Sequence, residues 1–257
     1  MNSHHRFDGP DEAPVLMLSN SLGSSLEMWE PQVPGLTEHF RVLRYDQRGH
    51  GASPVPPGPY TIDQFGADAV DLLDSLGLER VSFCGLSMGG AVGQWLAIHA
   101  PERLVRLAIC CTAAKFGTPE IWAERAAAVR AAGSIEPLAD AVMERWFTAA
   151  FRAEHAGEVA RTRAMLVATP AEGYAASCDA LAACDLRPDL GSIRTPTLVV
   201  AGAEDPATPV EQAEGLVAAI PGSRLVVIPG TAHFAQLERT EDFNRAILSH
   251  LAEGASP

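Results

Sequence analysis

The sequence predicts an α/β fold in which a mostly parallel, twisted sheet is covered by helices on both faces. Short runs of β-branched and other apolar residues alternate with helix-forming stretches along most of the chain, as in strands joined by crossover helices. One of these runs turns abruptly into an apolar helix through a glycine-rich segment. The expected strands span residues 15–18, 42–45, 81–84, 104–110, 197–201 and 225–228.

The helices between these strands carry their own signals. Residues 62–76 keep apolar side chains at helical spacing after the proline-rich turn of residues 54–61. Residues 91–100 form an apolar stretch that Pro101 ends, because proline cannot continue a helix. Both stretches fit the crossover helices that a parallel sheet requires.

Residues 116–190 interrupt the alternation, because this stretch is rich in alanine and contains no convincing strand. A helical block inserted at the carboxyl edge of a parallel sheet is well placed to cover a site as a lid. The alternative is a helical layer that only packs on the sheet. We therefore expect a core of residues 1–115 and 191–257 and a lid of residues 116–190, with helices at 119–132, 136–151, 155–168 and 171–183.

Length and composition indicate one large domain. The chain has 257 residues, 47% of them apolar, which is enough to bury a sizeable core. No apolar run approaches the roughly 20 residues that a membrane-spanning helix requires, and residues 1–12 lack the apolar segment of a secretory signal. The five cysteines show no C-x-x-C spacing, so we expect a cytoplasmic protein whose cysteines are reduced.

The charge balance restricts the class of partner. The net charge is −13, which opposes binding to nucleic acids and to anionic membranes. An anionic small molecule would need a local cationic group in its binding site. The sequence leaves the oligomeric state open.

The segment Gly85-Leu86-Ser87-Met88-Gly89 is the most informative motif in the chain. It lies directly between the expected strand 81–84 and the expected helix 91–100. A serine with glycines two positions away on each side suits a sharp strand-to-helix turn that raises the serine hydroxyl above the sheet edge. Ser87 is therefore the predicted nucleophile; the alternative is a glycine-rich turn with an idle serine.

A serine hydroxyl needs a base to attack at neutral pH, and the base needs a group that orients it. Among eight histidines, His233 follows the last expected strand, where its ring can lie over the sheet edge. Asp205 occupies the same edge after the strand 197–201 and precedes Pro206, with Glu204 as the competing carboxylate. The chain order of serine, aspartate and histidine is that of a nucleophile-elbow hydrolase.

The oxyanion formed on attack needs two N–H donors. One is expected from Met88, at the start of the helix behind the nucleophile, and the other from Leu22 in the small-residue loop after the first strand. Asp46 and Arg48 lie in the turn after the strand 42–45, and we interpret them as structural.

At this point the chain resembles the α/β-hydrolase superfamily over essentially its whole length, and more narrowly the 3-oxoadipate enol-lactone hydrolases. Asn20-Ser21 differs from the His-Gly pair of many superfamily members, a change that the resemblance assigns to the enol-lactonases. The segments that carry the resemblance are residues 18–32, 40–53, 83–90, 144–152, 173–180 and 229–238.

The resemblance implies a substrate and a reaction. The substrate would be a five-membered enol lactone with an acetate arm, hydrolysed in the β-ketoadipate pathway of aromatic degradation without a metal or organic cofactor. Arg145 and Arg125 are candidates for the carboxylate contact, and Trp146 is either a wall for the lactone ring or a core residue. The alternatives are a carboxylesterase, a carbon-carbon bond or aminoacrylate-type hydrolase, and a non-catalytic ligand receptor on the same fold.

Overall fold

A computed structural model describes residues 3–253 of the chain. Its centre is a seven-stranded sheet with the order β1-β3-β2-β4-β5-β6-β7, and every neighbouring pair is parallel except β1 and β3. The α/β fold expected from the sequence is confirmed. The strands are β1 His5–Asp8, β2 Val15–Ser19, β3 Arg41–Tyr45, β4 Val81–Leu86, β5 Leu104–Cys110, β6 Thr197–Gly202 and β7 Arg224–Ile228.

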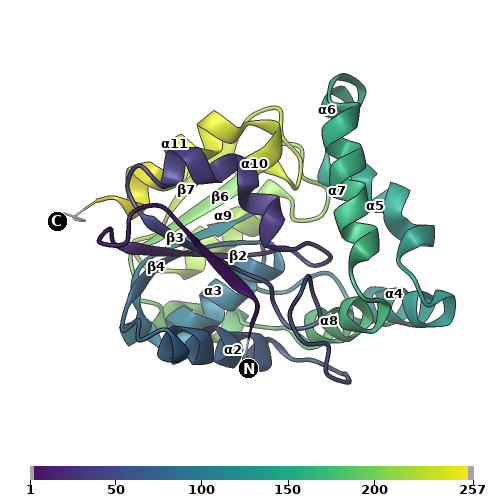
Figure 1. Cartoon of the computed structure of the whole chain (residues 1–257), viewed down its shortest axis with the longest axis horizontal. Coiled ribbons are helices and arrows are strands. Elements are labelled where there is room, and N and C mark those ends of the chain that lie inside the picture. Colours follow the sequence, from purple (N-terminus) through teal and green to yellow (C-terminus); the bar gives the residue numbers. More distant parts are fainter. Residues whose placement is uncertain (1–2, 254–257) are drawn as a thin grey trace.

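Helices cover both faces of this sheet, with α2 and α3 below it and α11 above it in Figure 1. Thr61 caps α2 in a reciprocal capping box with Gln64, which satisfies two N–H groups at the start of the helix. The core helices are α1 Val33–Leu36, α2 Ile62–Ser75, α3 Met88–His99, α9 Val210–Ala219, α10 Ala235–Glu238 and α11 Thr240–Leu251, with 3-10 turns η1 Leu26–Gln32, η2 Pro101–Arg103 and η4 Arg187–Ser192.

A separate block of helices stands between β5 and β6 in the sequence and to one side of the sheet in Figure 1. Its helices lie within residues 116–190, where the sequence predicts helices, and both the division into core and lid and the role as a lid stay predictions. The first two and last four residues of the expected core lie outside the described residues. The block consists of α4 Pro119–Ala132, η3 Glu136–Leu138, α5 Ala139–Trp146, α6 Ala149–Glu154, α7 Ala156–Ala168 and α8 Ala171–Ala183.

Two expectations about the elements are corrected. The single helix expected over residues 136–151 is broken, because Phe147 is extended and Thr148 begins α6 by accepting a hydrogen bond from Phe151 N–H. From the sequence, His4 and His5 are expected in an amino-terminal tail, but the segment that holds His5 is strand β1, which pairs antiparallel with β3. Both features depend on residues far away in the sequence.

The order of the strands places the site. The chain passes from β2 outward to β3, then returns to β4 on the other side of β2. Ligands of open parallel sheets bind at the carboxyl ends of strands where the order reverses in this way. Here that point lies between β2 and β4, so the loop after β2 and the turn after β4 come together.

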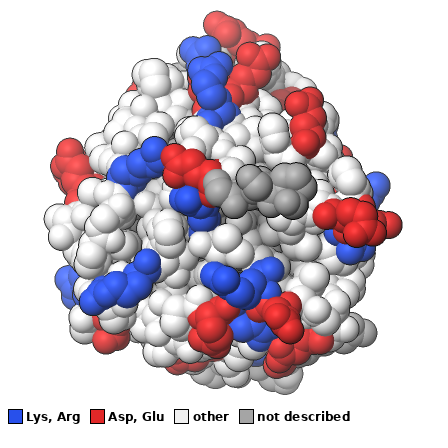
Figure 2. Space-filling view, turned by 90° about the vertical axis from the view of Figure 1, so that its left-hand side faces the viewer, with Lys and Arg blue, Asp and Glu red and all other residues white. Residues whose placement is uncertain are grey.

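The surface on the side away from the helical block is mixed in charge. Figure 2 shows Lys and Arg interspersed with Asp and Glu on this face, without a continuous basic stripe. Near the carboxyl terminus, for example, Arg106 pairs with Glu253 at 3.1 Å. Within residues 3–253, no helix is both long and apolar enough to cross a bilayer.

Candidate active site

Ser87 occupies a strained turn between β4 and α3. Its φ of 58° and ψ of −116° lie outside the regions that non-glycine residues normally adopt. The flanking glycines permit this turn: a Cβ at Gly85 would overlap the Gly89 carbonyl, and one at Gly89 would overlap the Ser19 carbonyl. The sequence therefore folds locally into the elbow that its glycine spacing predicts.

His233 and Asp205 meet at the same edge of the sheet. His233 Nδ1 lies 2.8 Å from Asp205 Oδ2, and both side chains are buried. Because a carboxylate only accepts, Nδ1 is assigned the proton, which leaves Nε2 to act as an acceptor. The competing Glu204 is exposed. The structure thus pairs the predicted acid with the predicted base.

Three further donors fix the Asp205 carboxylate. Oδ1 accepts hydrogen bonds from Ala207 N–H at 2.7 Å and Thr208 N–H at 3.1 Å, and Oδ2 accepts one from Thr208 Oγ1 at 2.6 Å. Burial alone would raise the pKa of Asp205, but the electrostatic interaction and hydrogen bond with His233, together with the hydrogen bonds from Thr208, outweigh it and hold that pKa below its usual value. The carboxylate is therefore ionised and oriented toward the imidazole.

The backbone amides of Leu22 and Met88 have no acceptor within residues 3–253, although the amides on either side of each are bonded. Gly23 N–H donates to His50 Nε2 at 3.0 Å, and Gly89 N–H donates to the Asn20 carbonyl at 3.0 Å. The two unpaired donors are those predicted for the oxyanion hole. Their role stays a prediction, and the lack of an acceptor within these residues leaves both amides available for it.

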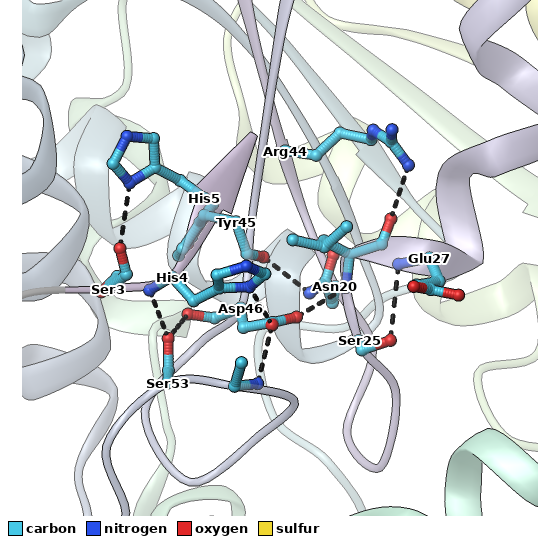
Figure 3. Close-up of polar contacts among 12 residues, drawn as sticks. Ser3, His4, His5, Asn20, Ser25, Glu27, Arg44, Tyr45, Asp46 and Ser53 are labelled. Carbon is cyan, nitrogen blue, oxygen red and sulfur yellow. Dashed lines mark hydrogen bonds and ion pairs between the residues drawn. The ribbon is translucent and has the colours of Figure 1, made fainter. Parts of the chain in front are cut away.

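Asn20 and His50 hold the loop that carries Leu22. Asn20 Nδ2 donates to the Tyr45 carbonyl at 2.8 Å, as Figure 3 shows, and its Oδ1 accepts from Trp29 Nε1 at 3.0 Å. His50 is fully buried, and burial lowers its pKa, so a neutral ring accepts from Gly23 and donates from Nδ1 to the Arg48 carbonyl. Asn20 thus supports the loop, which explains how this sequence accommodates an asparagine there.

Asp46 joins three segments beside this loop. Its carboxylate accepts from Leu26 N–H at 2.7 Å and Ala52 N–H at 2.9 Å, and it lies 2.8 Å from His4 Nδ1. These contacts converge in Figure 3. Arg48 pairs with Asp68 at 2.6 Å. The structural interpretation of Asp46 and Arg48 agrees with these contacts, while the contribution of His4 was not foreseen.

Ser87, His233 and Leu22 line one cavity of about 150 Å³ that α4, α5 and α8 enclose. Trp146 forms part of its wall and stacks on Phe234, with ring centroids 4.0 Å apart and an interplanar angle of 14°. Trp146 is therefore buried in packed aromatic side chains and also faces the cavity. Among residues 3–253, Ser87 Oγ has no hydrogen-bond partner, so the hydroxyl is available to a bound molecule.

Arg125 on α4 and Arg145 on α5 line the same cavity. Neither forms an ion pair with any carboxylate in the part of the chain that the structure describes. Desolvation and repulsion from Arg125 lower the pKa of Arg145, although its side chain remains exposed at the cavity. Arg125 lies over Trp122 at 5.1 Å and near Tyr174 Oη at 3.5 Å. Two unpaired cations thus face the serine in a strongly acidic protein.

Sequence reasoning missed several residues of this cavity, including Ser21, Trp122 and Tyr174. Ser21 lies beside Leu22 in the loop after β2, whereas Trp122 on α4 and Tyr174 on α8 reach the cavity from helices distant in sequence, and no local motif marks them as cavity residues. Cys84 lies behind the elbow and is buried, with its sulfur 3.8 Å from that of Cys110. Among residues 3–253, no group of three or more His, Cys, Asp or Glu side chains is placed to hold a metal ion.

Comparison with known proteins identifies the family to which the chain belongs. The model of the α/β-hydrolase fold family matches residues 14–240. A 3-oxoadipate enol-lactonase of Acinetobacter baylyi is 44% identical over 93% of this chain and 89% of its own length. The enol-lactonase structure from Burkholderia xenovorans superimposes with a TM-score of 0.95 at 45% identity, covering 97% and 96% of the two chains.

A hydrolase structure from Pseudomonas aeruginosa gives a TM-score of 0.93 at 48% identity and covers 96% of this chain and 93% of its own. These similarities extend over the sheet, the elbow and the inserted helices alike. The chain belongs to the α/β-hydrolase family.

Proposed function

We propose that this protein is a serine hydrolase that opens the lactone ring of 3-oxoadipate enol-lactone to give 3-oxoadipate, a step of the β-ketoadipate pathway of aromatic degradation. Similarity to proteins named enol-lactonases over more than nine-tenths of the chain supports the substrate. The observation that carries the reaction is one cavity that contains Ser87 and the Asp205-paired His233. The amides of Leu22, which lines this cavity, and of Met88, the residue after Ser87, have no acceptor in the described part of the chain.

The first half of the reaction acylates the serine. Ser87 Oγ adds to the ring carbonyl while His233 Nε2 takes the hydroxyl proton, and ionised Asp205 stabilises the resulting imidazolium. The amides of Leu22 and Met88 receive the oxyanion, and each such donor typically contributes about a hundredfold or more to the rate. The collapse of this intermediate breaks the bond between the carbonyl carbon and the ring oxygen.

The ring oxygen leaves as an enol that takes the proton from His233. The enol tautomerises to a ketone, which removes the oxygen nucleophile that would close the ring again. Water then attacks the acyl group on Ser87, with His233 as the base, and releases the keto diacid. Side chains and water perform every step, so the proposal includes no metal or organic cofactor.

The cavity also suits the charge and shape of this substrate. Its carboxylate arm would meet Arg145 or Arg125, neither of which pairs with a carboxylate among residues 3–253. The flat lactone ring would lie against Trp146, whose orientation the stack on Phe234 fixes. A helical block that closes this cavity would exclude water from the oxyanion, so we propose that residues 116–190 act as a lid.

A direct comparison of substrates tests the proposal. The purified protein is expected to hydrolyse the enol lactone faster than p-nitrophenyl acetate at equal concentration. Activity on the ester with the lactone untouched would instead assign a carboxylesterase or another hydrolase of this fold. Tight binding of the lactone without turnover would assign a ligand receptor.

We also propose a cytoplasmic location and a small-molecule partner only. The five cysteines of the chain are all unpaired and buried, which suits a reducing compartment. The net charge of −13 disfavours nucleic acid and anionic membrane surfaces as partners.

A further inference from the structure

The carboxylate of Glu238, at the end of α10, binds two segments that lie far apart in the sequence. Oε2 accepts a hydrogen bond from the N–H of Ala232, the residue before His233, at 2.5 Å. Oε1 accepts hydrogen bonds from both the N–H and the Oγ1 of Thr148, each at 2.8 Å. One side chain therefore joins the loop of the predicted base to the break between α5 and α6.

A second set of contacts joins the same two segments. Phe234 N–H donates to the Trp146 carbonyl at 2.9 Å, and the two aromatic rings stack. The residues on both sides of His233 are thus attached to the residues on both sides of Phe147. Trp146 is also a wall of the cavity, so this junction couples the position of the imidazole to the position of that wall.

The chemistry of the junction requires an acceptor oxygen at each end of the side chain. The N–H groups of Ala232 and Thr148 belong to the backbone and cannot exchange donor for acceptor, so the side chain between them must accept at both ends. Burial raises the pKa of Glu238, and the charge of Glu204 adds to this effect, while the hydrogen bonds of Ala232 and Thr148 act against it. The chain thus keeps a carboxylate where burial disfavours its charge.

We propose that Glu238 is a positioning residue, which holds the His233 loop and residues 146–148 of the lid in one arrangement so that the imidazole reaches Ser87 when the cavity wall is in place. The inference rests on the proposed catalytic roles of Ser87 and His233. Displacements of about 1 Å at a reacting group can cost about a hundredfold in rate. Glu238 therefore acts on the reaction through His233 and does not contact the substrate.

The substitution Glu238→Gln tests this role because it keeps the shape of the side chain. In either orientation, the amide NH₂ faces a backbone N–H and one of the two contacts is lost. We expect kcat to fall about tenfold on both the enol lactone and p-nitrophenyl acetate, since His233 serves both reactions. Amide hydrogen exchange should rise together in residues 146–152 and 230–234. Glu241→Gln, at an exposed carboxylate of α11, is the matched control and should change neither quantity.

A second pair of variants, at Thr148, tests the same junction without altering Glu238. Thr148→Val deletes the hydroxyl that donates to Glu238 and should lower kcat in the same direction, whereas Thr148→Ser keeps the hydroxyl and should retain normal kcat. These variants decide the question if Glu238→Gln does not fold.

The proposal is overturned if folded Glu238→Gln keeps kcat within twofold, or if exchange rises in only one of the two segments. Thr148→Val and Thr148→Ser with equal kcat would also overturn it. If the unaltered protein hydrolyses p-nitrophenyl acetate but not the lactone, the proposed substrate fails while the Glu238 test proceeds on the ester. Inactivity on both compounds would reject the Ser87–His233 mechanism and this inference with it.

Discussion

Replacement of Arg125 and of Arg145 by methionine should discriminate between charged and neutral substrates. Methionine keeps much of the apolar stem of arginine and removes its charge. Arg125 is half-buried beside Tyr174, whereas Arg145 is more exposed. Loss of the charge should therefore weaken binding of a carboxylate substrate more in Arg125→Met than in Arg145→Met.

The size of the effect follows from the environment of the two guanidinium groups. Two unit charges about 4 Å apart attract by about 4 kcal/mol at an effective dielectric constant of about 20, and hydrogen bonds to charged groups contribute about 1.5–3 kcal/mol net. Because Arg145 is exposed to solvent, its contribution to binding the substrate carboxylate should be near the lower end of the range of about 1.5–3 kcal/mol. We expect kcat/KM for the lactone to fall about a hundredfold in Arg125→Met and about tenfold in Arg145→Met.

The assay measures kcat/KM for the enol lactone and for neutral p-nitrophenyl acetate on each variant. The ester should change less than threefold. Arg130→Met is the matched control, because Arg130 also lies on α4 but pairs with Glu172 and Asp179 away from the cavity. Equal losses on both substrates, or an unchanged value for the lactone in both cavity variants, would refute the charge argument.

Three further predictions concern the turn at Ser87, the cavity wall and a buried histidine. The Cβ introduced by Gly89→Ala would meet the Ser19 carbonyl and displace the adjacent Met88 amide, a predicted oxyanion donor. This substitution should therefore lower kcat about a hundredfold, and an unchanged kcat would contradict the prediction. Trp146→Ala should raise KM for the lactone and lower the free energy of unfolding by about 3–5 kcal/mol. A variant with normal kinetics and an unchanged free energy of unfolding in urea would exclude Trp146 both as a cavity wall and as a core residue. Because burial lowers the pKa of His50, the unfolded state binds more protons below about pH 6.5, so urea denaturation should show stability falling on acidification more steeply than in His50→Gln. Parallel pH profiles would contradict the last prediction.

The predictable part of the fold was the part encoded locally. Strand β4, the elbow at Ser87 and the start of α3 follow from adjacent residues, because glycine placement and apolar runs act over a few positions. Asp205 and His233 could be located because the carboxyl ends of parallel strands share one edge. The pairing of His233 Nδ1 with Asp205 agrees with that reasoning.

The unpredicted parts depend on distant partners. Strand β1 is four residues long and polar, and it is recognisable only from its pairing with β3. The helix expected over residues 136–151 breaks because Glu238 and Phe234 bind the backbone near Phe147. The helix propensity of residues 136–151 depends only on neighbouring residues and carries no information about these distant contacts. The tertiary hydrogen bonds override that propensity in the folded protein.

The most direct test of the account is the turnover of the enol lactone by Ser87→Ala. Ser87 is predicted to form the covalent intermediate, so its loss should lower kcat by about 10⁴-fold or more, while the melting temperature changes little. The side chain makes no hydrogen bond to other residues among 3–253, which is why stability should be preserved. A folded Ser87→Ala variant that retains more than about a tenth of normal kcat would contradict the proposed mechanism.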